Sequence, residues 1–346
     1  MPDKTDSKVS YGNFQKPFGL VYRMLTSGQR AAWSALFREA LAIAAKPVDM
    51  VLQLQERKLL SDLQTENSQT PALLIVGPPR CGTTLIYQVL SLCLDVSFPT
   101  NLGSLFPKSP LTVNRFAGKP RADFQNFYGQ TARMSGPNDA FHLWNRWLGD
   151  DRYVTRTDLS EDELTTMQRF FTAWADKFGK PFLNKNNRNV QCIDYLQKAL
   201  PQAYFIGVFR DPVCVARSLI HARQAVQGDK KIGWGLQCQE EHCHQDDFGY
   251  IQDVCDQVRK NNRDLKRQLD SMDQDRVIRI QYESFCHDPD QCLTQIISQV
   301  PGLNRRPGIE QFGKDAFQAS QSKPLSVTEE GILCKNFSAD KSNVRV

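Results

Sequence analysis

A short apolar run followed by a glycine loop constrains the fold of this chain most strongly. Residues 72–76, Ala-Leu-Leu-Ile-Val, form a continuous apolar segment that is typical of a strand buried on both faces of a parallel sheet. The loop at 77–84 follows, and apolar positions at helical spacing predict a helix over 83–94. The N–H groups and dipole at such a helix start favour an anion. The segment therefore predicts an α/β fold with a phosphate site.

The loop keeps the glycine spacing of a Walker A motif but lacks its lysine. Gly77 and Gly82 are spaced as in G-x-x-x-x-G-K-[ST], yet Thr83 stands at the lysine position. Without that point charge for β- and γ-phosphates, hydrolysis of a nucleoside triphosphate is not expected. Arg80 supplies a cation from the other end of the loop. The loop therefore predicts a nucleotide with a single 5′-phosphate, and a purely structural turn is the alternative.

The rest of the chain alternates short strands with helices. Strands are predicted at 181–184, 204–209 and 277–281, and helices at 139–148, 160–178, 189–200, 211–226 and 246–271. Helix starts are marked by Ser160 with Glu163, by Asp211 before Pro212, and by Asp288 before Pro289. Such alternation is typical of a parallel sheet covered on both faces. We therefore expect a P-loop-like three-layer α/β/α fold with helical insertions.

Residues 1–66 are predicted to form an N-terminal helical extension of a main domain that spans 67–346. Residues 1–30 mix Gly, Pro and charges, which predicts loose order. Apolar positions at helical spacing predict an amphipathic helix over 31–45 that Pro47 ends, followed by a second helix to about residue 63. Such a helix could lie on a membrane surface, but packing against the domain is favoured, so we expect at most peripheral membrane contact.

Charge and targeting signals narrow the class of partner. The chain has 43 Lys and Arg against 38 Asp and Glu, a formal net charge of +5. This diffuse excess suits a small anionic ligand and does not indicate nucleic acid. The N-terminus lacks the apolar core of a signal peptide, and no run approaches the roughly 18 apolar residues that span a bilayer. We therefore expect a cytoplasmic protein.

The 10 cysteines are scattered and predict no disulfide framework. The cluster of Cys238, His242, Cys243 and His244 leaves two interpretations open, a structural zinc site and a solvated helical face. The solvated face is favoured, so no metal is expected.

A second segment places a cation where another phosphate could bind. Arg210 ends the strand predicted at 204–209, and Ser218 lies on the helix that follows, so both could reach one phosphate. Arginine suits phosphate because it bonds in a fork. A local ion pair with Asp211 is the alternative, and Arg217 and Arg223 are secondary candidates.

Together these segments resemble the nucleotide-binding motifs of sulfotransferases that use 3′-phosphoadenosine 5′-phosphosulfate (PAPS). The segment Gly-Pro-Pro-Arg-Cys-Gly-Thr-Thr at 77–84 is similar to the family's 5′-phosphosulfate loop, G-x-P-[RK]-[SA]-G-T-T, with Cys81 in place of the common serine. The segment 204–218 is similar to the 3′-phosphate motif, a strand ending in Arg-Asp-Pro with a serine eight residues after the arginine. The resemblance covers roughly residues 70–300.

The resemblance implies transfer of the sulfuryl group from PAPS to a hydroxyl, or alternatively an amine, yielding 3′,5′-adenosine bisphosphate without a metal. It implies that the nucleotide is held by Arg80, Cys81, Gly82, Thr83 and Thr84 at its 5′ end and by Arg210 and Ser218 at its 3′-phosphate.

Two further residues match weaker motifs of the same family. Lys185 stands at a strand end in Leu-Asn-Lys-Asn, where the family has a lysine that faces the sulfuryl group and stabilises charge on the bridging oxygen. An exposed lysine is the alternative. Tyr282 follows a late strand in Tyr-Glu-Ser and is expected near the adenine, with a packed aromatic as the alternative.

The general base is the least determined member of the site. Asn101 occupies the place where many relatives carry a glutamate, and Asn138 replaces the first acid of a later motif. Asp139 is therefore the first candidate and His142 the second, since residues three apart share a helix face. His221 is a further candidate, and a helix cap is the alternative for Asp139.

Two other functions remain open from the sequence, a nucleotide-dependent kinase or triphosphatase of the same fold and a non-catalytic nucleotide-binding protein.

The acceptor is also open between a carbohydrate, a lipid and another small molecule such as a phenol. Aromatic residues between 116 and 147 either line its site or pack in the core. The oligomeric state is undetermined.

Overall fold

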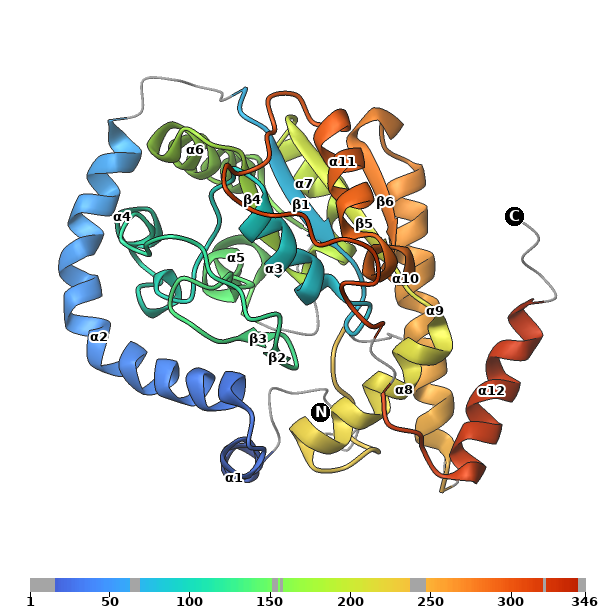
Figure 1. Cartoon of the computed structure of the whole chain (residues 1–346). Helices are drawn as coiled ribbons and strands as arrows, with labels where there is room; N and C mark the ends of the chain where they lie inside the picture. The colour runs from blue at the N-terminus through green and yellow to red at the C-terminus, as the bar shows by residue number, and fades with distance from the viewer. Residues whose placement is uncertain are drawn as a thin grey trace, which may run out of the picture.

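The computed structural model describes residues 16–62, 69–150, 155, 158–236, 247–319 and 322–341. Its centre is a parallel sheet of four strands in the order β4-β1-β5-β6 (Figure 1). The strands are β1 (Ala72–Val76), β4 (Phe182–Lys185), β5 (Ala203–Phe209) and β6 (Val277–Gln281). All three pairings are parallel, which confirms the predicted α/β architecture and the three predicted later strands to within one residue at each end.

Helices cover both faces of the sheet because successive side chains of β1 point to opposite sides. Leu73 and Ile75 belong to one buried cluster, and Leu74 and Val76 belong to another. The first face is covered by α3 (Thr83–Cys93), α8 (Pro212–Ala222), α10 (Tyr282–His287) and α11 (Pro289–Gln299). The second is covered by α5 (Phe141–Leu148), α6 (Glu161–Phe178) and α7 (Ile193–Ala199), while α9 (Gly249–Asp270) contributes to both.

The predicted helix starts are confirmed by hydrogen bonds. At α6 both bonds of the capping box between Ser160 and Glu163 are present. The Asp211 side chain caps α8, and Asp288 caps α11. The predicted single helix over 189–200 is wrong: a 3₁₀ turn, η2 (Asn187–Gln191), precedes α7, because the Asn186 side chain binds the Arg188 N–H and tightens the chain there.

The N-terminal predictions need two corrections. Part of the segment expected to be loose forms α1 (Pro17–Thr26), because Pro17 suits a first turn and Met24 is buried against the next helix. That helix, α2 (Arg30–Ser61), is continuous through Pro47. Because proline has no N–H, the carbonyl of Ile43, four residues earlier, loses its helical donor. Pro47 and Ile43 both lie on the exposed side, so water can bind this carbonyl instead. Figure 1 shows α2 as one bent helix, and a proline in a helix interior is a usual cause of such a bend. The predicted boundary at 66/67 lies outside the described residues.

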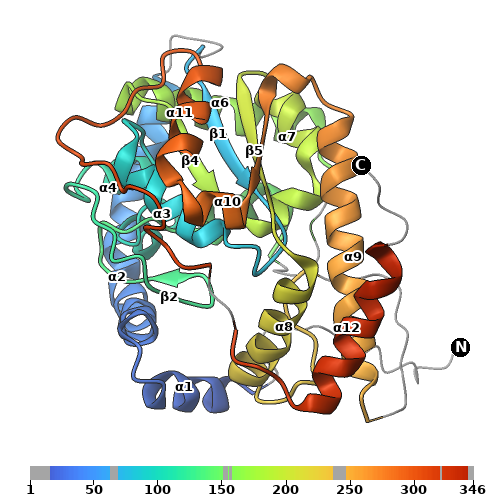
Figure 2. The same cartoon turned by 45° about the vertical axis from the view of Figure 1, so that its right-hand side comes forward.

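The long connection before α5 contains several short elements. They are η1 (Gly103–Leu105), α4 (Pro110–Asn114) and the antiparallel hairpin of β2 (Asn126–Phe127) and β3 (Gln130–Thr131). The hairpin packs against α1 and α2, where Phe127 joins Met24 and Ala32 in a third buried cluster. Figure 2 shows α1 below β2, reaching towards the end of α8.

The C-terminal helix, α12 (Val327–Lys341), packs on α8 and α9. Glu330 binds Arg217 through two hydrogen bonds of 2.7 and 3.0 Å, and Glu329 binds Lys230 at 2.6 Å. The remaining short elements are the π-helical turn η3 (Arg223–Gln227) and the 3₁₀ turn η4 (Gln274–Arg276). In the described part of the chain no helix is both long enough and apolar enough to cross a membrane.

Candidate active site

All four strands of the sheet end at one cavity of about 470 Å³. Because the strands are parallel, their carboxyl ends share one edge, the usual place for a ligand in such sheets. The loop after β1 lies there, and Lys185, Arg210 and Tyr282 lie at or directly after the ends of β4, β5 and β6. In the parallel pairing of β1 and β4, Lys185 lies beside Ile75 of β1. The sheet therefore gathers residues that are far apart in the sequence.

The first turn of α3 opens on this cavity without a side-chain cap. The start of a helix leaves N–H groups that no helical carbonyl can accept. Side chains supply acceptors at α6, α8 and α11, but none does so at α3. Gly82, Thr83 and Thr84 line the cavity there. The arrangement leaves the positive end of the α3 dipole for an anion, as the loop predicted.

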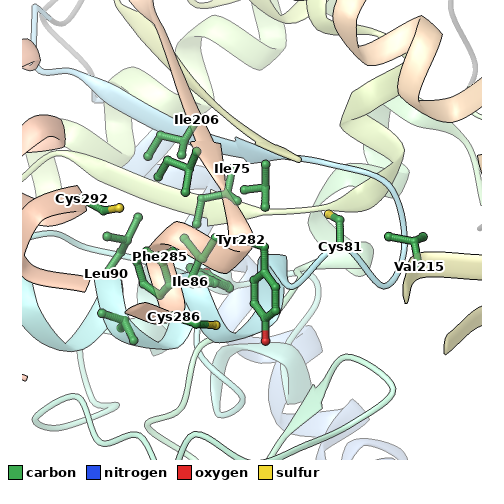
Figure 3. Close-up of a cluster of buried hydrophobic side chains, with 14 of the residues drawn as sticks. Ile75, Cys81, Ile86, Leu90, Ile206, Val215, Tyr282, Phe285, Cys286 and Cys292 are labelled. Atoms are coloured by element: carbon green, nitrogen blue, oxygen red, sulfur yellow. The ribbon is translucent and has the colours of Figure 1, made fainter. Parts of the chain in front are cut away.

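Gly82 is required both by its backbone and by its neighbour. Its φ of 96° lies in the left-handed region, and a Cβ on it would collide with the ring of Tyr282. Tyr282 is 4% exposed and belongs to the buried cluster shown in Figure 3. The guanidinium of Arg210 lies over its ring, 4.6 Å from the centroid. Tyr282 thus packs in the core and lines the cavity at the same time, and its place near the adenine stays a prediction.

Arg80 and Arg210 meet at the wall of the cavity. Arg210 is 7% exposed and donates to the Arg80 carbonyl at 3.0 Å. Arg80 has a φ of 73°, a strained conformation for a residue with a side chain. Burial, with Arg210 beside it, lowers the pKa of Arg80. Both arginines line the cavity, so an anion bound there could accept hydrogen bonds from either guanidinium.

Ser218 and Cys81 lie behind the wall of the cavity. Neither residue is among those that line it. Ser218 is 4% exposed and accepts a hydrogen bond of 2.9 Å from Arg80 Nε, so its hydroxyl positions the arginine. Cys81 points into the core cluster drawn in Figure 3. Burial raises the pKa of its thiol to about 11, and the thiol is neutral at pH 7.

Lys185 and Asp139 form a close pair in the cavity. Lys185 Nζ lies 2.6 Å from Asp139 Oδ2, and their side chains are 2% and 17% exposed. The turn that presents Asp139 is sharp, with Ala140 at a φ of 55°. Asn186 Nδ2 also donates to the Asp139 carbonyl at 3.1 Å. The exposed-lysine alternative is therefore wrong, and two predicted residues from different motifs are adjacent.

The other two base candidates lie elsewhere. His142 lines a neighbouring cavity of about 230 Å³, which Asp139 borders as well. Burial, and Arg146 to a smaller extent, lower the pKa of His142 to about 4. His221 binds the Lys323 carbonyl at 2.7 Å and does not line the main cavity. Asp139 is the candidate nearest to Lys185.

Asn101 and Asn138, which stand where the resemblance implies acids, contact each other. Asn138 Nδ2 donates to Asn101 Oδ1 at 2.8 Å. Asn101 is fully buried and donates in turn to Thr131 Oγ1 at 2.9 Å and to the Arg133 carbonyl at 2.8 Å. The pair joins the segments around 101, 131 and 138 without burying a charge.

Several cavity residues had no sequence motif. Tyr128, at the tip of the β2–β3 hairpin, lies under the Arg80 guanidinium at 4.9 Å and meets the Trp234 ring at 6.1 Å. Leu20, Met24 and Leu36 of α1 and α2 form an apolar part of the cavity wall, and Glu39 of α2 lines the cavity as well. Trp144 and Trp147, which shared the aromatic segment, are buried in the core instead.

The remaining candidates are engaged or lie outside the described residues. Arg217 is held by Glu330, and Arg223 is buried and donates to Gln257 at 3.2 Å. The cluster of Cys238, His242, Cys243 and His244 falls in the segment 237–246, which is not described. In the part of the chain that is described, no group of three or more His, Cys, Asp or Glu could hold a metal ion.

Comparisons with known proteins agree with this architecture. The family model described as "Sulfotransferase family" matches residues 71–303. The chain is 26% identical over 300 residues to the omega-hydroxy-beta-dihydromenaquinone-9 sulfotransferase Stf3 of Mycobacterium bovis and of Mycobacterium tuberculosis, with 77% of this chain and 73% of each relative covered. Its fold is similar to that of the sulfotransferase STF1 from Mycobacterium tuberculosis, with a TM-score of 0.51 and 12% identity over 95% of this chain and 94% of the other. Since the family model spans most of the chain, including the loop, Lys185, Arg210 and Tyr282, this protein belongs to the sulfotransferase family.

Proposed function

We propose that this sulfotransferase takes its sulfuryl group from PAPS, bound at the carboxyl edge of the sheet. The observation that carries the proposal is the meeting of an uncapped helix start with Arg80, Lys185 and Arg210 in one cavity. The 5′ end of the donor would accept hydrogen bonds from the first turn of α3, with Thr83 and Thr84 adding hydroxyls. The backbone of Cys81 would complete the loop, while its thiol is buried in the core cluster.

The second phosphate distinguishes PAPS from other nucleotides. Arg210 and Arg80 are adjacent at the cavity wall, and Arg210 is held over Tyr282. Such a fixed guanidinium can bind the 3′-phosphate through two hydrogen bonds. Ser218 supports this through its bond to Arg80, a more indirect role than the motif implied.

Lys185 and Asp139 are assigned the chemistry. Asp139 accepts the proton of the acceptor hydroxyl as its oxygen attacks sulfur. The new oxygen–sulfur bond forms while the bond between sulfur and the bridging phosphate oxygen breaks, and adenosine bisphosphate leaves. Lys185 stabilises the negative charge that grows on the leaving oxygen. The pair is already close, at 2.6 Å, and mostly shielded from water, so little reorganisation is needed.

The acceptor is proposed to be a lipid-like alcohol. The cavity that Asp139 lines has an apolar part of its wall formed by Leu20, Met24 and Leu36, where a hydrocarbon would be removed from water. By its name, the Mycobacterium relative acts on a hydroxylated menaquinone, a lipid-like molecule. Cytoplasmic location and independence of a metal remain predictions from the sequence.

The donor assignment is tested by thermal denaturation with 3′,5′-adenosine bisphosphate and with adenosine 5′-monophosphate. We expect stabilisation by the bisphosphate, a much smaller effect of the monophosphate, and loss of the difference in Arg210→Ala. Arg217→Ala is the matched control, since Arg217 follows on α8 but binds Glu330 outside the cavity. Equal responses to both nucleotides in the wild type would refute the 3′-phosphate site.

A further inference from the structure

We infer that the outer surfaces of α1 and α2 dock this protein onto a lipid bilayer that carries anionic headgroups. We call these outer surfaces the apolar arm; on α2 it consists of Trp33, Phe37, Ala40, Ala44, Val48 and Val51, and on α1 of Phe18, Tyr22 and Leu25. The inference goes beyond the proposed function and uses it only for the route by which an acceptor enters.

The apolar arm is a continuous exposed stripe. Its α2 members recur every three or four residues, which places them on one side of the helix. Trp33, Phe37 and Val51 are 52%, 61% and 67% exposed, and Phe18 is 91% exposed. In the described part of the chain, the large exposed hydrophobic side chains outside residues 18–54 are Phe116, Phe248 and Val327. A patch concentrated in this way marks an interaction surface.

Three charged residues of α2 face the domain, while its apolar stripe faces outward. These residues, Arg38, Asp49 and Glu56, are 5%, 3% and 2% exposed, and the other charged residues of the helix are exposed. Arg38 donates to the Thr131 carbonyl at 2.7 Å, and Glu56 accepts from the Thr112 N–H at 2.8 Å. These bonds fix the rotation of the helix, so the stripe cannot turn inward without breaking them. The domain therefore holds the apolar side outward.

The charges around the arm favour an anionic surface. Between residues 16 and 62 the exposed basic residues are Lys16, Arg30, Lys46, Arg57 and Lys58, and the exposed acidic residues are Glu39 and Asp62. Helices that lie in a membrane interface combine apolar side chains with lysine and arginine beside them. Each basic residue near such a surface adds attraction to anionic lipids.

The inner side of the same helices lines the active-site cavity. Leu20, Met24 and Leu36 form an apolar part of its wall, and Val21 both lines it and is 41% exposed. The cavity is thus lined by the same two helices that carry the arm. A lipid-like alcohol could pass from the bilayer to Asp139 and Lys185 without its hydrocarbon part crossing water.

Vesicle sedimentation of the full chain tests the inference without donor or acceptor. The vesicles consist of phosphatidylcholine, either alone or with roughly one third phosphatidylglycerol. We expect binding to both, stronger with the anionic lipid. In Trp33→Ser/Phe37→Ser the partition coefficient should fall by about tenfold or more, because two large apolar side chains are lost from the interface. Neither residue lines the cavity.

Phe116→Ser/Val327→Ser is the matched control, since it removes two exposed apolar side chains outside the arm. It should bind vesicles as the wild type does. Circular dichroism and thermal denaturation of both double variants check that they fold. Wild-type protein that stays in the supernatant, or equal losses in the two variants, would overturn the inference. The inference would also be overturned if Trp33→Ser/Phe37→Ser changed the oligomeric state of the protein but still bound vesicles. The arm would then bind a second copy of the chain.

Quenching of tryptophan fluorescence by brominated lipid gives a second measurement. The variant that it uses keeps an aromatic side chain at position 33. Trp33 should be quenched in the wild type. Trp33→Phe should bind equally while losing most of the quenching, since Trp144, Trp147 and Trp174 are buried and the fifth tryptophan, Trp234, is half-buried in the cavity wall. Quenching that persists in Trp33→Phe would show that another surface faces the bilayer and refute the inference. Nucleotide stabilisation, measured separately, decides the donor assignment independently of either result.

Discussion

At the scale of single residues, Asp139 and Lys185 carry the proposed reaction. The two groups lie 2.6 Å apart although they are separated by 46 positions in the sequence. Each residue is predicted from its own resemblance to a sulfotransferase motif, Lys185 at a strand end and Asp139 beside Asn138, which replaces the first acid of the motif. What neither pattern contained was their pairing, which joins the proton acceptor to the cation at the leaving group.

Asp139→Asn and Lys185→Ala should each lower kcat by roughly 10²–10³-fold, and the double variant should lose about as much as either single one, because the pair acts as a unit. Adenosine bisphosphate should still stabilise Asp139→Asn against heat. Asp95→Asn is the control, since Asp95 also lies 2.6 Å from a lysine, Lys180, but that pair is about 40% exposed on the surface. Additive losses in kcat would argue that the two residues act separately.

Other residues show how far a motif determines a role. Thr83 and Thr84 line the cavity as the loop motif implied, whereas Ser218 and Cys81 lie behind it. A motif records which residue type occupies a position but not which way the side chain points. The Ser218 hydroxyl accepts a hydrogen bond from Arg80, and the Cys81 thiol packs in the buried cluster.

At the scale of elements, the attachment of α2 depends on buried carboxylates. Glu56 accepts hydrogen bonds from the N–H groups of Leu111 and Thr112 at 3.0 and 2.8 Å, in the first turn of α4. It also accepts from Thr112 Oγ1 at 2.8 Å. A carboxylate at a helix start is favourable through the helix dipole as well. This contact ties the N-terminal helices to the segment that carries the hairpin and Asn101.

Glu56→Ala should lower the free energy of unfolding by about 2–4 kcal/mol, because it removes charge-assisted bonds and leaves two buried N–H groups without an acceptor. Urea denaturation measures the change. Gln55→Ala, at the adjacent exposed position of α2, should stay within about 0.5 kcal/mol of the wild type. A loss in Glu56→Ala no larger than in Gln55→Ala would show that α2 is held by its apolar contacts alone.

At the scale of the whole molecule, acid sensitivity follows from a half-buried histidine, His142. The pKa of His142 is lowered to about 4 in the folded chain, chiefly by burial, against an ordinary value near 6.5. Between these values the unfolded chain binds a proton at His142 that the folded chain does not. Its contribution to stability is complete above about pH 6.5 and is lost as the pH falls towards 4.

The free energy of unfolding should therefore fall by up to about 3 kcal/mol from this group between pH 7 and pH 4, on the scale of 1.4 kcal/mol per pKa unit. In His142→Gln that part of the pH dependence should disappear, whatever the variant's stability at pH 7. Urea midpoints collected at several pH values measure both slopes. Identical slopes for the two proteins would contradict the burial of a neutral imidazole.

The sequence by itself determined the sheet, the glycine loop between β1 and α3, and most helix starts of this protein. These features depend on residues close together in the chain: a buried apolar run, the glycine spacing, and caps such as Ser160 and Asp211. Their hydrogen bonds form within a few residues, so the local pattern suffices.

Only the tertiary structure decided which of these features meet. It paired Asp139 with Lys185, placed Ser218 behind Arg80, and carried α2 through Pro47 with its apolar side outward. Each outcome depends on contacts between segments that are distant in the sequence, and a hydrophobic period does not say which partner a helix side will face. The same packing joined the apolar arm to the cavity, a relation that no single segment of the sequence contains.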